Sequence, residues 1–166
     1  MRRFLNYSSL AGKAAVNSDG AILLGRNISC DGFDRDRRVA VLTHIHQDHI
    51  TSFERLLGYC EPIYMTHATR EMLIALKGRS LSFRRNLVGI DFGSAIDIGD
   101  EKMSLHPCVH VLGSCQVLVK DAEGCTILYS SDFNLSTKPP KAQILVVDGT
   151  YGDPSYSFSY DRLELV

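Results

Sequence analysis

The sequence lacks paired cysteine motifs, long apolar runs and an excess of charge of one sign. Its five cysteines form no CxxC pair, and their odd number argues against both a disulfide framework and a zinc ribbon. No apolar run approaches the roughly 18 residues of a membrane helix. Because the net charge is −1, any nucleic-acid binding would have to use local basic patches. These absences predict reduced, mostly buried thiols in a cytoplasmic protein without a membrane partner.

Signals for export and for nucleotide binding are also absent. Asn6, Ser8 and Ser9 interrupt the apolar core that an export signal would need. There is no glycine-rich phosphate loop, no dinucleotide fingerprint and no Ser-His-Asp arrangement. The 166 residues, with 45% hydrophobic and 22% charged side chains, predict one ordinary globular domain. Basic clusters at 35–38 and 77–85 are candidates for phosphate contacts, and solvated loop charges explain each of them equally well.

Short apolar runs separated by turn residues predict an α/β protein with layered sheets and helices. The run 39–43 is rich in β-branched residues and predicts a buried strand. An Asp-Gly pair at 19–20, between two apolar runs, predicts a hairpin. The second half is more purely β, which favours a mixed or antiparallel sheet. Further strands are predicted in 62–66, 103–112, 114–132 and 142–152, and helices in 50–60 and 67–78.

One short stretch concentrates the chemistry of the chain. Residues 43–50, THIHQDHI, hold three of the six histidines and an aspartate. His44 and His46 lie two apart where a predicted strand ends, so their rings can share one metal ion. Asp48 and His49, expected in the first turn of the following helix, can reach a neighbouring position. This spacing suits two ions, which about 3.5 to 4 Å apart can hold a hydroxide and stabilise a displacement at phosphorus.

Two later residues complete the candidate site. His110 and Asp132 each follow a β run, and loops at one rim of a layered α/β fold gather such residues. They would add a third imidazole and a bridging carboxylate. A polar surface turn is the alternative for the histidine cluster, and the apolar strand directly before it argues against that alternative.

Five other residues are left out of the candidate site. His67, at a predicted helix start, is interpreted as a capping or surface histidine. His106, within a predicted strand, is interpreted as an inward histidine that makes a hydrogen bond. Cys108 lies near His110 in the sequence, but a buried thiol is the favoured interpretation. Ser114 is a candidate for a position near a substrate phosphate, and Tyr151 fits base stacking and packing equally well.

Five motifs follow one another along the chain: CDGF at 30–33, THIHQDH at 43–49, HVLGS at 110–114, SSDF at 130–133 and DGTYG at 148–152. In order and spacing they resemble the metallo-β-lactamase fold and its β-CASP nuclease branch, which includes Artemis-like DNA nucleases, RNase J and the polyadenylation endonuclease. The resemblance implies an αββα sandwich, expected to be incomplete at the C-terminus. It also implies a single metallo-β-lactamase-like domain over residues 1–166, without the β-CASP cap.

The resemblance implies a role for each site residue, with Asp48, Asp132 and Asp148 as the catalytic positions. The implied set is His44, His46 and His110 on one metal ion, Asp48 and His49 on a second, Asp132 as the bridge, Asp31 as the support of a ligand histidine, and Asp148 in proton transfer to the leaving group.

The implied function is that of a metal-dependent phosphodiester hydrolase, an exonuclease-like nuclease that acts on RNA or DNA through a hydroxide held by two metal ions. Zinc is favoured by the ligand types, with manganese and iron as alternatives. RNA processing and DNA repair both fit the motifs, and a homodimer is left open. The alternative functions are a non-catalytic metal-binding scaffold or fragment, and a small-molecule (thio)ester hydrolase of the same fold.

Departures from the family pattern concern the completeness of the site. Ser131 stands where the fourth motif usually has glycine, and Gly149 stands where serine or threonine is common. No histidine follows His110, although the family uses one late histidine as a ligand and another as a general acid. The sequence is therefore expected to be the front portion of a longer polypeptide. A shortened relative with an incomplete site is the alternative.

Overall fold

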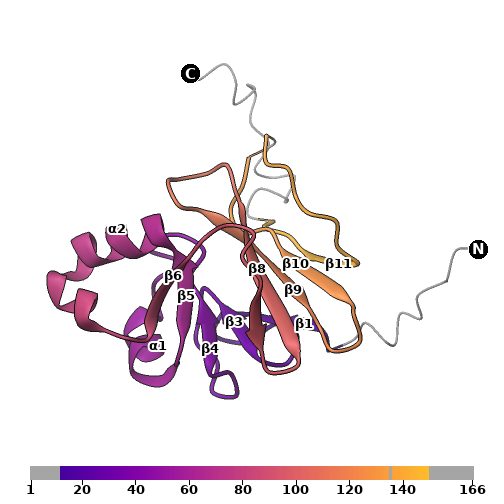
Figure 1. Cartoon of the computed structure of the whole chain (residues 1–166), viewed down its shortest axis with the longest axis horizontal. Coiled ribbons are helices and arrows are strands. Elements are labelled where there is room, and N and C mark those ends of the chain that lie inside the picture. Colours follow the sequence, from indigo (N-terminus) through magenta and orange to yellow (C-terminus); the bar gives the residue numbers. More distant parts are fainter. Residues whose placement is uncertain (1–11, 135, 150–166) are drawn as a thin grey trace, which may run out of the picture.

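The structure is a computed structural model that describes residues 12–134 and 136–149 (Figure 1). Two β-sheets pack face to face, and helices cover the other face of the first sheet. The layer order is therefore helix, sheet, sheet. This confirms the predicted α/β layered fold, and the described residues supply three of the four layers of an αββα sandwich.

The first sheet has six strands in the order β1-β2-β3-β4-β5-β6. Strands β1 to β3 pair antiparallel, whereas β3 to β6 pair parallel. Four carboxyl ends therefore meet at one edge, which is where ligands bind in open sheets of this kind. The strands are Ala14–Val16 (β1), Ile22–Leu24 (β2), Ile28–Cys30 (β3), Val39–Val41 (β4), Ile63–Thr66 (β5) and Leu87–Ile90 (β6).

The second sheet has five strands in the order β11-β10-β9-β8-β7. Its neighbours pair antiparallel except β10 and β11, which are parallel. The Cys115 amide donates to the Thr43 carbonyl at 3.1 Å, so the start of β9 is joined to the chain just after β4. The strands are Ile96–Ile98 (β7), Glu101–Pro107 (β8), Cys115–Lys120 (β9), Thr126–Tyr129 (β10) and Ile144–Val146 (β11).

Side-chain alternation along the first sheet produces two cores. In β4, Val41 packs between the sheets, whereas Ala40 and the following Leu42 pack against the helices. Because β4 is buried on both faces, the loop that follows it starts from a fixed position. The helices are Phe53–Tyr59 (α1) and His67–Lys77 (α2), and a 3-10 helix, Arg79–Phe83 (η2), follows α2.

Most of the elements predicted from the sequence are confirmed, including the hairpin of β1 and β2 and both helices. Strands β3, β6 and β7 were not predicted from the sequence. All five cysteines are buried and form no disulfide. Within the described ranges, no helix has the length and apolar character that crossing a membrane requires.

Candidate metal centre

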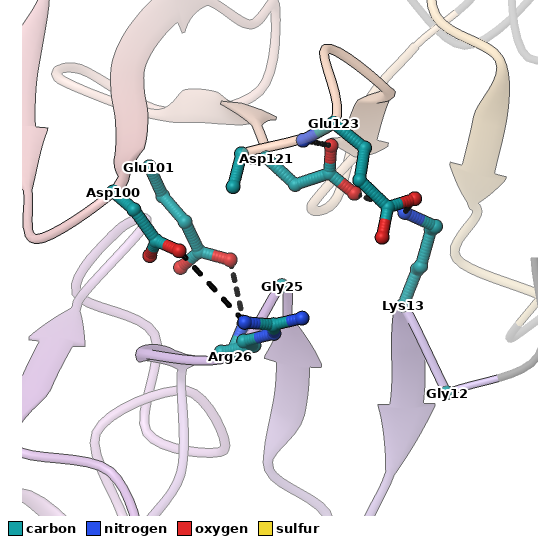
Figure 2. Close-up of a pocket in the computed structure, with 9 residues that line it drawn as sticks. Gly12, Lys13, Gly25, Arg26, Asp100, Glu101, Asp121 and Glu123 are labelled. Atoms are coloured by element: carbon teal, nitrogen blue, oxygen red, sulfur yellow. Dashed lines mark hydrogen bonds and ion pairs between the residues drawn. The ribbon is translucent and has the colours of Figure 1, made fainter.

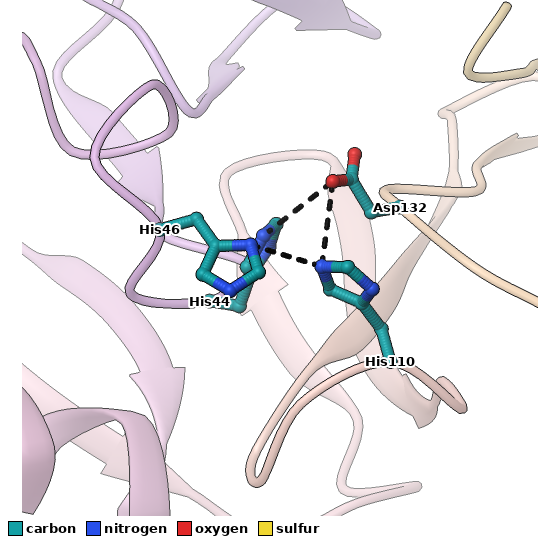
Figure 3. A group of neighbouring side chains, drawn as sticks. All are labelled: His44, His46, His110 and Asp132. Atoms are coloured by element: carbon teal, nitrogen blue, oxygen red, sulfur yellow. Dashed lines mark hydrogen bonds and ion pairs between the residues drawn. The ribbon is translucent and has the colours of Figure 1, made fainter. Parts of the chain in front are cut away.

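The candidate site lies where the two sheets meet at the carboxyl edge of the first sheet (Figure 3). His44 and His46 follow β4, His110 lies in the loop between β8 and β9, and Asp132 follows β10. Residues that are far apart in the sequence are thus brought together by strand ends from both sheets. One ligand atom from each of these four residues lies within 4.8 Å of the others.

The distances in this cluster fit a shared cation. His46 Nδ1 lies 3.0 Å from His110 Nε2. Asp132 Oδ2 lies 3.4 Å from His110 Nε2 and 3.7 Å from His44 Nε2. Two ligands held about 2.1 Å from one ion at a tetrahedral angle are about 3.4 Å apart, so the side chains need to move little. The cluster is therefore suited to a divalent metal ion.

His44 provides the strongest sign that the cluster is built for a ligand. Its Nδ1 faces the hydroxyls of Thr43 at 3.1 Å and Ser131 at 3.4 Å, while its buried Nε2 has no hydrogen-bond partner. Burial, together with the imidazoles of His49, His110 and His46, lowers the pKa of His44 to about 3. A buried polar atom without a partner is rare in native proteins. A neutral imidazole has a lone pair, and a metal ion would give Nε2 the missing partner.

Asp132 faces a second histidine with its other oxygen. Its Oδ1 lies 3.2 Å from His49 Nε2, whereas Oδ2 faces His44 and His110. Asp48 Oδ2 lies 3.6 Å from the same nitrogen of His49, and its side chain is 80% exposed. The two oxygens of Asp132 thus point to two groups of potential ligands.

The expected placement of Asp48 and His49 in the first turn of a helix is wrong, because α1 begins only at Phe53. Residues 47–52 form consecutive turns instead. The amides of His49 and Ile50 both donate to the His46 carbonyl, at 3.1 and 3.2 Å. This tight turn, rather than a helix, brings Asp48 and His49 back over the cluster.

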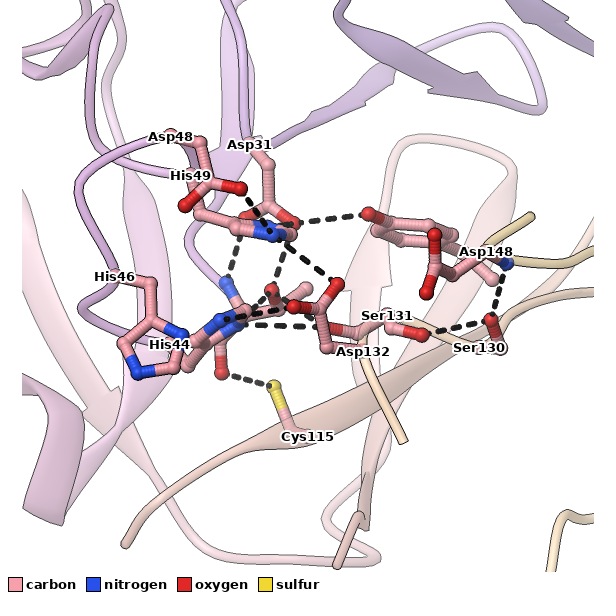
Figure 4. Close-up of polar contacts among 12 residues, drawn as sticks. Asp31, His44, His46, Asp48, His49, Cys115, Ser130, Ser131, Asp132 and Asp148 are labelled. Atoms are coloured by element: carbon pink, nitrogen blue, oxygen red, sulfur yellow. Dashed lines mark hydrogen bonds and ion pairs between the residues drawn. The ribbon is translucent and has the colours of Figure 1, made fainter. Parts of the chain in front are cut away.

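Asp31 organises the buried side of the site (Figure 4). Its Oδ2 lies 2.8 Å from His49 Nδ1 and accepts hydrogen bonds from the hydroxyls of Thr43 at 2.6 Å and Tyr129 at 3.2 Å. The Thr43 amide donates to Oδ1 at 2.8 Å. Burial by itself lowers the pKa of His49, but Asp31 and the carboxylates of Asp132 and Asp48 outweigh it and raise the pKa to about 9. Asp31 thereby holds the His49 ring with Nε2 toward Asp132.

Ser131 joins the two halves of this network. Its hydroxyl donates to the Thr43 hydroxyl at 2.8 Å, and its backbone has a φ of 53°. A left-handed backbone explains why glycine is usual at this position in the family motif, since a side chain there is strained. Here the side chain offsets that strain with a buried hydrogen bond behind His44.

Asp148 follows β11 and is half-buried. Its amide donates to the hydroxyl of Ser130 at 3.0 Å (Figure 4). Ser130 precedes Asp132 by two residues in the chain. The structure therefore places Asp148 at the same edge as the cluster. Tyr151 lies outside the described residues.

The histidines interpreted as structural lie away from the cluster. His67 is the first residue of α2, its side chain is 64% exposed, and Thr66 is the residue that caps the helix. His106 is half-buried and its Nε2 lies 3.0 Å from the Ser104 hydroxyl.

Several residues that shape the site were missed or misplaced by sequence reasoning. The buried Cys108 thiol donates to the Asp132 carbonyl at 2.8 Å and so fixes the backbone of Asp132. Ser114 is buried, and its hydroxyl accepts from the Val111 amide at 3.0 Å; it closes the His110 loop instead of facing a phosphate. Thr43 contacts both Asp31 and His44, and its position directly before His44 was the one sequence signal for that role. No sequence signal marked the contact of Tyr129 with Asp31.

Comparisons with known proteins place these features in context. No protein-family model matches the chain. Ribonuclease TTHA0252 of Thermus thermophilus is 31% identical over 87% of this chain and 40% of that protein. RNase aCSPSF2 of Saccharolobus solfataricus is 26% identical over 85% of this chain and 37% of its own length. A protein named "Probable DNA ligase" from Opitutus terrae is 29% identical over 70% of this chain and 11% of its own length. The chain spans less than half the length of each of these relatives.

Solved structures agree on the fold. A metallo-β-lactamase with the HARLDQ motif from Cronobacter sakazakii matches with a TM-score of 0.56 and 19% identity, over 75% of this chain and 61% of that one. At this identity the likeness concerns the fold alone. Taken with the ordered motifs and the sequence relatives, it identifies this chain as a metallo-β-lactamase-fold protein whose homologues are β-CASP nucleases.

Proposed function

We propose that this chain carries the metal-binding site of a nuclease that hydrolyses phosphodiester bonds in nucleic acid. The observation that carries the proposal is the buried, unpartnered Nε2 of His44, which faces the cluster of His46, His110 and Asp132. In a protein interior such an atom is costly unless a ligand completes it. The relatives named as ribonucleases support a nuclease over a scaffold or a (thio)ester hydrolase, and these alternatives are not favoured.

The ligand assignment that we propose follows the two oxygens of Asp132. One ion would bind His44, His46 and His110 with Oδ2, and a second would bind Asp48 and His49 with Oδ1. Zinc suits this set of imidazoles and carboxylates, and manganese or iron are the alternatives.

Bound divalent ions would supply Lewis acidity to a phosphodiester and lower the pKa of a water. The chain itself contributes orientation. Asp31 holds the ring of His49, and the hydroxyls of Thr43 and Ser131 hold that of His44. We assign to Asp148, at the same edge, the transfer of a proton to the leaving group.

RNA is the substrate that we propose first, because the relatives that cover most of this chain are named as ribonucleases. DNA is the second candidate, and the match to a protein named as a DNA ligase is the observation that favours it. Exonuclease-like action, a homodimer and a cytoplasmic location remain predictions.

The test uses labelled single-stranded RNA and DNA of one sequence, each incubated with the 166-residue chain loaded with zinc or with manganese. We expect RNA to be cut at least about tenfold faster than DNA, since the 2′-hydroxyl lets a protein distinguish the two. EDTA should stop the reaction. Faster cutting of DNA would select the second candidate, and no cleavage of either by fully metal-loaded chain would contradict nuclease activity of this chain.

Replacement Asp31→Asn probes the support of His49. An amide keeps the size of the side chain but removes the charge that holds His49 Nδ1 at 2.8 Å. We expect metal affinity to fall by about 10- to 100-fold, the usual cost of losing such a partner. Competition with a fluorescent zinc chelator measures this. The matched control is Asp34→Asn, a nearby aspartate outside the cluster; equal affinities of both variants and the parent chain would contradict the assigned role.

A further inference from the structure

A second feature, separate from the metal ligands, lies at the end of η2. Phe83 is 85% exposed, although it is a large aromatic side chain, and Arg84 and Arg85 directly follow it. Within the described part of the chain, the Phe83 ring contacts no other aromatic ring and no cation. A single exposed apolar residue is common on protein surfaces. An exposed aromatic residue followed directly by two exposed arginines is a more specific combination.

The charges around Phe83 are not neutralised. Lys77, Arg79, Arg84 and Arg85 are all exposed, and none forms an ion pair with a residue that the structure describes. The acidic side chains nearest in the sequence are Glu71 and Asp91; Glu71 is paired with Arg70, and Asp91 lies 3.7 Å from His67. One further carboxylate, Glu61, lines a hollow beside Arg84 and Arg85. The segment therefore has a net positive charge although the whole chain carries −1.

Phe83, Arg84 and Arg85 form a ridge between two hollows. One hollow, of about 420 Å³, lies toward Tyr59 and Asn86. The other, of about 440 Å³, extends past Leu87 and Gly89. Both are lined by the same three ridge residues. A chain laid across the ridge would have room on each side of it.

The ridge is held in place from below. Leu81 of η2 is buried, and the Ser82 hydroxyl donates to the Arg79 carbonyl at 2.7 Å. Arg70 donates to the Leu87 carbonyl at 3.1 Å, which ties α2 to the edge strand β6. A site with a fixed backbone loses less entropy on binding.

The second hollow leads toward the metal centre. It follows β6 to Gly89 and His67, the first residue of α2. The preceding residue, Thr66, donates to the Gly113 carbonyl at 2.8 Å, and Gly113 lies in the loop that carries His110. The second hollow therefore follows the edge strand β6 from the ridge toward the carboxyl edge of the first sheet, the edge at which the candidate metal centre lies.

We propose that this ridge is a binding site for single-stranded nucleic acid, in which one base stacks on Phe83 while Arg84 and Arg85 contact the flanking phosphates. Stacking requires an unpaired base, and an arginine on each phosphate supplies charge complementarity. This binding proposal rests on the proposed function in one respect, namely that the bound strand would be the substrate of the nuclease. Binding is tested without cleavage, so the two proposals can fail separately.

The experiment measures binding of a fluorescein-labelled 12-nucleotide single-stranded RNA by anisotropy, in EDTA and over a range of salt concentrations. We expect Phe83→Ala to weaken binding about tenfold, the usual loss of one base stack, with the salt dependence unchanged. Phe83→Trp should retain binding. Arg84→Ala with Arg85→Ala should lower the slope of log K against log salt by about 1.4, since each phosphate contact on a single strand contributes about 0.7.

The charge-matched control is Arg26→Ala with Lys120→Ala, because both positions are exposed and neither lines a hollow beside the ridge. It should bind within twofold of the parent chain. Single-stranded DNA of the same sequence separates the two nucleic acids, and duplex RNA should bind more weakly than either single strand. Equal binding by the parent chain and all ridge variants, with unchanged melting temperatures, would overturn the proposal and leave the ridge as a surface for a protein partner.

Discussion

The variant Asp132→Asn is expected to cut nucleic acid at least about a thousandfold more slowly than the parent chain. Its carboxylate faces three histidines, with Oδ2 at 3.4 and 3.7 Å from His110 and His44 and Oδ1 at 3.2 Å from His49. An asparagine side chain has nearly the same shape as aspartate but carries no negative charge. Its NH2 group would replace one of the two carboxylate oxygens that face the histidines. Metal ions contribute several kcal/mol to charge stabilisation at phosphorus, and each 1.36 kcal/mol is a factor of ten in rate, which gives the expected magnitude.

Two measurements separate this effect from misfolding. Metal content, measured by plasma mass spectrometry on the dialysed protein, should fall from the proposed two ions per chain to one or fewer. Circular dichroism should show the parent fold, because the backbone of Asp132 is still held by Cys108. The matched control is Asp91→Asn, an exposed carboxylate outside the cluster. Full metal content together with an unchanged cleavage rate in Asp132→Asn would contradict the bridging assignment.

His46→Ala gives an independent test of the same site, with His106→Ala as its control. His46 Nδ1 lies 3.0 Å from His110 Nε2, whereas His106 bonds to Ser104 and lies outside the cluster. Loss of activity in the first variant alone would locate the reaction at the cluster. Equal loss in both would point to a general effect of histidine removal on the fold.

The sequence was most informative where a strand runs directly into polar residues. An apolar run at 39–43 followed by His44 and His46 predicts both a buried strand and the side on which its ligands lie, because strand direction determines side-chain direction. The distance between His46 and His110 could not be obtained in this way. It depends on how two sheets pack, and no local pattern encodes that packing.

The polar network behind the ligands illustrates the same limit. Tyr129 is the last residue of β10, and the sequence pattern predicts only a core residue there. In the structure its hydroxyl donates to Asp31, 98 positions earlier in the chain. Asp48 and His49 are expected from the sequence in the first turn of a helix, whereas residues 47–52 form turns and α1 begins at Phe53. The His49 amide donates to the His46 carbonyl three positions earlier, and such a turn bond is not visible in a pattern of apolar residues.

A buried carboxylate far from the metal centre has the largest expected effect on stability. Glu101, the first residue of β8, is 1% exposed. It accepts a hydrogen bond from the Arg26 amide at 2.7 Å (Figure 2). It also accepts from the Asn27 amide and side chain at 3.1 and 2.9 Å, and thereby joins the two sheets. The fit is tight, because a Cβ at Gly25 would lie 2.1 Å from Glu101 Oε1.

Glu101→Ala is therefore expected to lower the free energy of unfolding by about 3 kcal/mol, and the melting temperature by roughly 10 °C. The reason is that three donors lose a charged acceptor at once, and water replaces only part of it in the hollow of about 210 Å³ that adjoins the site. Urea unfolding followed by circular dichroism measures the change. Asp100→Ala is the matched control: its carboxylate is 51% exposed and lies 3.8 Å from Arg26, so its loss should cost less than about 1 kcal/mol. Similar losses of unfolding free energy in both variants would show that burial of Glu101 contributes nothing specific. A large loss in Glu101→Ala alone, with metal affinity unchanged below the unfolding transition, would establish that Glu101 stabilises the sandwich at the end opposite to the candidate metal centre.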